Sequence, residues 1–132
     1  MKRKRKIWLI VLLVLIVITL SFVAIYFSIV KSIKTYSTTD FKGLDMQAVE
    51  DGNYSGNEDG GIVEVTVDVT VKDHKITNIT IVKHENGKGK PAEVIVNDII
   101  KNNSVEVDAI SGATYSSDVI KKAVYNALTP KK

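Results

Sequence analysis

The sequence has no cysteine and only two histidines among its 132 residues. Without cysteine there can be no disulfide framework, no cysteine-ligated metal and no lipid-modified N-terminal cysteine. His74 and His84 stand alone, with no carboxylate spacing that would complete a metal site. Ser111 and Ser117 lack the Gly-x-Ser-x-Gly elbow of many serine hydrolases. We therefore expect no metal site and no serine nucleophile.

Charge is also missing from one long stretch, the 24 residues from Ile7 to Val30. At about 1.5 Å per residue this run would form a helix of about 36 Å, and the hydrocarbon core of a bilayer is about 30 Å thick. The apolar core of a cleaved signal is only roughly 7–15 residues long, and no Ala-x-Ala-like site follows this run. We predict a transmembrane anchor over residues 7–30, preceded by a basic stub over residues 1–6.

The charges around the anchor are uneven. Five positive residues precede it, and only Lys31 and Lys34 follow it closely. By the positive-inside rule the N-terminus is cytoplasmic, so the chain is a single-pass cell-membrane protein with its domain outside the cytoplasm. From Thr35 onward, 11 Lys and Arg face 15 Asp and Glu, a net charge of −4. An acidic domain argues against a nucleic-acid partner.

The clearest local pattern lies in residues 61–72. Valines at every second position from Val63 to Val71 alternate with polar residues, which is typical of a strand with one buried face. Asp73 and His74 suit a two-residue hairpin turn, after which residues 75–84 return as a second strand. Ile76 and Ile79 would face opposite sides of a regular strand, so we expect a bulge there or burial on both faces.

Two helices are expected after the strands. Pro91 can open the first, and its apolar face comprises Val94, Ile95, Ile99 and Ile100. Ser116 or Ser117 would cap the second. Its apolar stripe comprises Val119, Ile120, Ala123, Val124, Ala127 and Leu128. We predict an α+β domain over residues 49–129, a small antiparallel sheet with two packed helices, joined to the anchor by a stalk over residues 31–48.

A run of small residues, Asp108-Ala109-Ile110-Ser111-Gly112-Ala113-Thr114, lies between a short extended segment and the last helix. Small residues let a backbone turn sharply and approach a ligand closely. The start of a helix supplies free N–H groups and a partial positive charge, which suit a phosphate, and Thr114 adds a hydroxyl. On these grounds alone, the run is either an anion site with a nucleophile beside it or a plain turn.

The stretch DAISGATYSS, followed by an amphipathic helix, resembles the FMN-binding domain family. This family includes the flavin subunits of sodium-pumping NADH:quinone reductase and of related electron-transport complexes. Its motif is an aspartate, two variable residues, Ser-Gly-Ala-Thr, and a Ser or Thr one residue later. The chain matches it at Asp108, Ser111, Gly112, Ala113, Thr114 and Ser116, and residues 49–128 follow the family order, including the Gly-rich loop 87–93.

The resemblance implies how a flavin is held. In the family, a transferase moves FMN from FAD onto the motif threonine as a phosphoester, using Mg²⁺, so Thr114 would be the attachment point. Ser111, Gly112 and Ala113 would shape the site. Asp108 would orient the turn or assist recognition by the transferase.

Two further residues carry open alternatives under this resemblance. Tyr115 either stacks on the flavin or simply packs its helix. His84 either contacts the flavin ring, and donates a proton when the ring is reduced, or is a solvated histidine at the end of a strand. The Gly-rich loop beside His84 either lies near the flavin or is solvated.

The resulting hypothesis is a bacterial, membrane-anchored flavoprotein that relays electrons outside the cytoplasm. Its partners would be the flavin transferase, a membrane electron donor of the quinol or NADH dehydrogenase type, and an acceptor that the sequence does not identify. It would be a carrier rather than a stand-alone enzyme, with no catalytic residue of its own. The alternative is a non-redox surface module that binds a peptide or wall component and leaves the motif unmodified.

Overall fold

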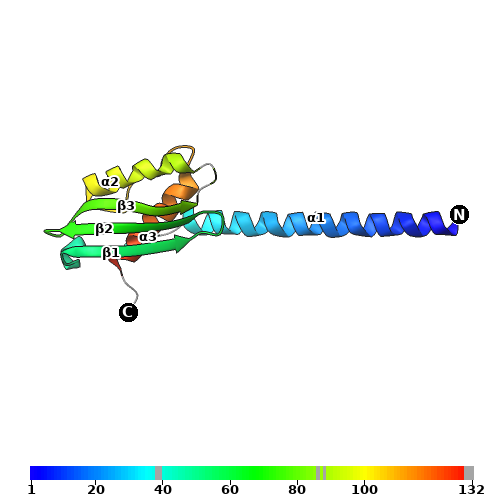
Figure 1. The fold of residues 1–132 in the computed structure, drawn as a ribbon, viewed down its shortest axis with the longest axis horizontal. Coiled ribbons are helices and arrows are strands. Elements are labelled where there is room, and N and C mark those ends of the chain that lie inside the picture. Colours follow the sequence, from blue (N-terminus) through cyan, green and yellow to red (C-terminus); the bar gives the residue numbers. More distant parts are fainter. Residues whose placement is uncertain (38–39, 86, 88, 130–132) are drawn as a thin grey trace. The chain divides into compact units, whose positions relative to one another are not determined.

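The computed structural model describes residues 1–37, 40–85, 87 and 89–129, and the chain divides into two compact units, Met1–Ile33 and Lys34–Lys132. Helix α1, Lys2–Ser37, contains the whole uncharged run (Figure 1). Its stretch Arg3–Lys31 is long and apolar enough to cross a membrane, and none of the apolar window is buried. These properties suit a membrane anchor or a signal sequence.

The second unit is built on a three-stranded antiparallel sheet in the order β1-β2-β3 (Figure 1). The strands are β1, Gly52–Asp59, β2, Glu64–Lys72, and β3, Lys75–Glu85. Two α-helices pack on this sheet: α3, Thr114–Leu128, contacts β1 and β2, and α2, Ile95–Asn102, contacts β3. The predicted fold class is therefore confirmed.

The alternating valines of β2 bury one face of the central strand. Val65, Val67 and Val69 are fully buried, whereas Asp68 between them is exposed. A period of two places every second side chain on the same face. The predicted strand is confirmed over Glu64–Lys72, three residues later than its expected start. Its buried face is part of the hydrophobic core.

Asp73 and His74 form the predicted two-residue turn between β2 and β3. Their φ angles are 51° and 59°, both in the left-handed region that a type I′ hairpin turn requires. Neither residue is glycine, so other contacts must support the turn. The His74 ring lies 2.8 Å from the Val49 carbonyl oxygen, which joins the turn to the segment before β1.

β3 contains the bulge that its sequence predicted. Its register against β2 shifts at two places, leaving Thr77 and Val82 without an opposite residue. Each extra residue reverses the side-chain alternation that follows it. Ile76 and Ile79 consequently both lie in the core, at 3% and 7% exposure.

The first predicted helix begins differently from the expectation. A 3₁₀ segment, η2, Lys90–Val94, contains Pro91 and precedes α2. Val94 was expected on the apolar face but is 56% exposed, while Ile95 and Ile99 are fully buried. The tighter winding of a 3₁₀ turn puts successive side chains at other angles than an α-helix does, and this rotates Val94 out of the core.

The last helix packs very closely on the sheet. All six residues of its predicted apolar stripe are buried. Gly56 of β1 lies directly beneath it, where a Cβ atom would stand 2.3 Å from the Ala123 carbonyl oxygen and 2.5 Å from the Ala127 nitrogen. The absence of a side chain at Gly56 therefore lets the backbone of α3 touch the sheet.

The core begins earlier in the chain than expected. Phe41 and Met46 are each only 8% exposed and belong to the same buried cluster as the β2 valines. Met46 opens a short 3₁₀ turn, η1, Met46–Ala48, and the Phe41 ring packs against Tyr125 of α3. Residues 41–48, which were expected to be part of a stalk, are thus part of the folded domain.

Candidate functional site

The motif residues form a tight turn that leads directly into α3. The backbone N–H of Ala113 donates to the Ile110 carbonyl oxygen at 3.0 Å, which closes a four-residue turn around Ser111 and Gly112. Gly112 has a φ of 79°, and nothing would lie within 4 Å of a Cβ atom there. The conformation of the turn, and not crowding, therefore requires glycine at this position.

Ser117 holds this turn from inside the protein. Its side chain is fully buried. The hydroxyl oxygen accepts a hydrogen bond from the Ile110 N–H at 3.0 Å and donates one to the Ala113 carbonyl oxygen at 2.9 Å. The expectation that Ser116 or Ser117 caps the helix is wrong, because α3 already begins at Thr114 and both serines are buried within it.

Thr114 is the first residue of α3, and it is exposed. The residue before it, Ala113, provides no side-chain cap for the helix end. The first N–H groups of a helix have no partner within the helix, and its N-terminus carries about half a positive charge. With the open space around Gly112 and Thr114 exposed, this helix end is accessible to an anion from solvent.

The Tyr115 side chain connects α3 to the β1–β2 loop. Its hydroxyl donates to the Gly60 carbonyl oxygen, and a Cβ atom at Gly60 would stand 2.9 Å from this hydroxyl. Burial raises the pKa of Tyr115, and the negative charges of Asp59 and Glu58 raise it further. The hydrogen bond joins the first turn of α3 to this loop, and a stacking contact between the Tyr115 ring and the flavin stays a prediction.

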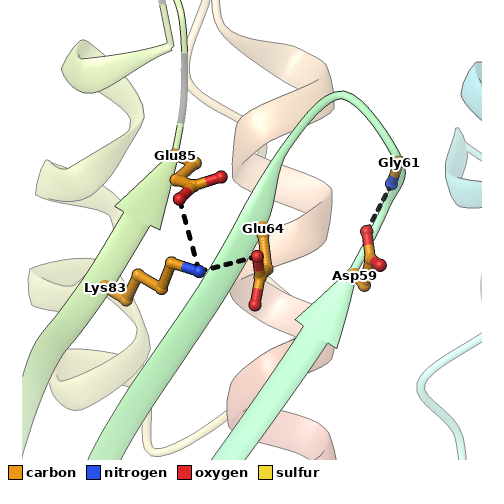
Figure 2. A network of polar contacts seen from close by, with 5 residues as sticks. All are labelled: Asp59, Gly61, Glu64, Lys83 and Glu85. Atoms are coloured by element: carbon orange, nitrogen blue, oxygen red, sulfur yellow. Dashed lines mark hydrogen bonds and ion pairs between the residues drawn. The ribbon is translucent and has the colours of Figure 1, made fainter.

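A set of polar contacts lies where the same loop joins the sheet (Figure 2). The Lys83 ammonium lies 2.8 Å from Glu64 and 3.3 Å from Glu85, and the Asp59 carboxylate accepts the Gly61 N–H at 2.8 Å. Hydrogen bonds to the two glutamates raise the pKa of Lys83. These contacts join β2 to β3 and shape the loop that receives the Tyr115 hydroxyl.

His84 is not a solvated residue at the end of a strand. Its side chain is only 2% exposed, and its Nδ1 lies 2.9 Å from Glu93 of η2. This pair joins β3 to η2, which overlaps the end of the Gly-rich loop. A contact between His84 and the flavin stays a prediction.

Asp108, the first residue of the motif, is exposed on the rim of a polar depression of about 360 Å³. The depression is also lined by Asp98, Asn102, Glu106 and Val107. In the part of the chain that the structure describes, no group of three or more His, Asp or Glu side chains could hold a metal ion.

A second set of residues that supports the site has no counterpart in the sequence predictions. Lys121 and Asp118 of α3 form a buried ion pair, with Nζ and Oδ1 2.9 Å apart and each side chain 10% exposed. The sequence indicates this pair only by its three-residue spacing within an apolar stripe, because residues three apart lie side by side on a helix. A charged pair is also compatible with an exposed helix edge, so the spacing alone does not reveal its burial.

A comparison with protein families agrees with this geometry. The model of the FMN-binding domain matches residues 60–129, more than half of the chain. The match runs from the β1–β2 loop through the end of α3 and includes the whole motif turn. The chain therefore belongs to the FMN-binding domain family, and FMN is the ligand that this membership indicates.

Proposed function

We propose that this protein is a membrane-anchored flavoprotein that carries FMN covalently on Thr114 and relays electrons outside the cytoplasm. The observation that supports it best is the placement of Thr114, which is exposed and begins α3 at an end without a side-chain cap, in a protein of the FMN-binding domain family. The turn around Ser111 and Gly112 leads directly to Thr114, and the exposure of this residue leaves it within reach of a second protein.

Attachment requires a flavin transferase with FAD and Mg²⁺. The Thr114 oxygen forms a bond to the phosphorus that carries the riboflavin group of FAD, and the pyrophosphate bond breaks. AMP leaves, and the hydroxyl proton passes to a base. The α3 N-terminus favours the resulting phosphate, since its partial positive charge stabilises an anion.

The bound flavin supplies one- and two-electron chemistry, and the protein positions and retains it. A covalent bond has a clear advantage outside the cytoplasm, because a dissociated FMN would diffuse away. Helix α1 would keep the carrier close to a membrane donor of the quinol or NADH dehydrogenase type. The uneven charges at its ends favour a cytoplasmic N-terminus.

The test is the intact mass of the full chain after co-expression with a flavin transferase. The wild type should gain the mass of one FMN less one water and should show flavin fluorescence, and Thr114→Val should do neither. Thr66→Val, a matched change on β2, should be labelled like the wild type. Valine has the shape of threonine, and position 114 is exposed, so Thr114→Val should still fold.

An unlabelled wild-type chain, produced beside a transferase that labels another acceptor, would contradict the proposal. It would favour a non-redox surface module with an unmodified motif.

A further inference from the structure

Lys121 occupies an unusual position for a lysine. It lies in the middle of α3 and is only 8% exposed, although lysine is among the residues least often buried. Its ammonium is 2.9 Å from Asp118 and 3.2 Å from the Val107 carbonyl oxygen. One cation therefore holds both a side chain of its own helix and the backbone of a distant segment.

That segment leads directly into the motif, because Val107 immediately precedes Asp108. Residues 106–110 belong to no helix or strand, so no regular backbone ladder holds them in place. Two side chains of α3 bind this stretch instead: Lys121 at the Val107 carbonyl and Ser117 at the Ile110 N–H. The conformation of Asp108 between these two points thus depends on both contacts.

The Phe41 ring is a third neighbour of the Lys121 ammonium. Its ring centroid lies 5.4 Å from Nζ, within the range of a cation–π interaction. The ring is itself buried, and it packs against Tyr125. A charge surrounded by protein interacts more strongly with nearby dipoles than it would in water, so the contact with Val107 is well placed to hold the backbone.

We propose that Lys121 is a positioning residue for the attachment of FMN. Its ammonium fixes the start of the motif loop at Val107, so that Asp108 and Thr114 are presented to the transferase in one arrangement. This inference rests on the proposed function, since it concerns the same site. The competing explanation is that Lys121 only compensates the buried Asp118 and supports the fold.

Two variants that both carry Asp118→Asn distinguish the positioning role of Lys121 from the purely structural one. Asp118→Asn removes the carboxylate but leaves the ammonium at Val107. The double variant Asp118→Asn with Lys121→Met also lacks the ammonium and keeps the apolar stem. It leaves no unpaired buried charge, which would itself be strongly destabilising. The two variants therefore differ in the contact to the motif loop and in the buried charge of Lys121, which Asp118→Asn leaves without its carboxylate. Tm is measured beside the rate so that the loss of stability in Asp118→Asn is separated from an effect on attachment.

The experiment measures FMN attachment to the purified full chain in detergent, with a flavin transferase, FAD and Mg²⁺. Initial rates at several concentrations of the chain give kcat and KM, and calorimetry on the same samples gives Tm. We expect Asp118→Asn to keep kcat/KM near the wild-type value. The kcat/KM of the double variant should fall about tenfold or more, because a small misplacement of a reacting group lowers the rate by a large factor.

Lys122→Met is the matched control, because the Lys122 ammonium lies over the Tyr125 ring at 4.7 Å and not at the motif loop. It should behave like the wild type. A double variant that is folded and labelled at the kcat/KM of Asp118→Asn would overturn the positioning role. A wild-type chain that takes no FMN would overturn the proposed function together with this inference, and the two failures are thereby distinguished.

Discussion

The contact between β1 and α3 gives the sharpest prediction, through Gly56→Ala. A Cβ atom at Gly56 would stand 2.3 Å from the Ala123 carbonyl oxygen, 2.5 Å from the Ala127 nitrogen and 2.7 Å from the Ala127 Cβ. Carbon atoms pack favourably at about 3.5–4.0 Å, so the helix must move by about 1 Å. The nearest atoms belong to the helix backbone, which a rotamer change cannot shift.

The expected cost follows from this displacement. Overpacking of a core typically costs about 1–3 kcal/mol. We expect Gly56→Ala to cost about 3 kcal/mol, because the backbone of α3 has to move. In a domain of this size each kcal/mol lowers Tm by about 4–8 °C, so we expect a fall of about 12 °C or more. The same movement displaces Thr114, which α3 carries at its N-terminus.

Gly52→Ala in the same strand is the matched control. A Cβ atom there would meet the Tyr54 ring at 3.7 Å, an ordinary contact, so the change should stay within about 0.5 kcal/mol. Differential scanning calorimetry of the full chain in detergent measures both variants. Equal Tm values for Gly56→Ala and Gly52→Ala would refute the close packing of α3 on β1.

Two further predictions concern the loop contact and the membrane. Tyr115→Phe removes the hydrogen bond to Gly60 and should cost about 1 kcal/mol. Because burial raises the pKa of Tyr115 above its ordinary 10.0, the contribution of its neutral hydroxyl should be complete below pH 10.0 and lost as pH rises through the folded-state pKa. The Tm difference between the wild type and Tyr115→Phe should therefore shrink at high pH, and a constant difference would contradict this origin. A protease added to intact cells with a single membrane should cleave the domain after α1, whereas full protection would contradict the proposed orientation.

Local periodicity predicted much of the fold correctly. The alternating valines of β2, the turn at Asp73 and the six-residue stripe of α3 all depend on residues close in sequence, where the geometry of a strand or helix sets which side chains share a face. Even the bulge in β3 is predicted by a local pattern, because Ile76 and Ile79 break a period of two. Patterns of this kind need no knowledge of the rest of the chain.

The errors arose where burial depends on distant segments. Phe41 lies in a polar stretch with no periodicity, and only its contact with α3 makes it part of the core. Val94 matched a helical face, yet the 3₁₀ turn before α2 rotates it outward. His84 lies near the end of a strand and was open to interpretation as solvated, but its side chain is 2% exposed and contacts Glu93 of η2.

The candidate site also combines local features, which the sequence predicts, with contacts between distant residues, which it does not. The motif itself, with Thr114 as the proposed attachment residue and glycine at position 112, can be recognised from consecutive residues, because the turn and the helix start are local structures. The supports of that turn come from elsewhere: Lys121 reaches Val107 across 14 residues, and Tyr115 reaches Gly60 across 55. Hydrogen bonds and buried charges act over a few ångströms in space regardless of separation along the chain, so only the tertiary structure could decide which side chains hold the motif in place.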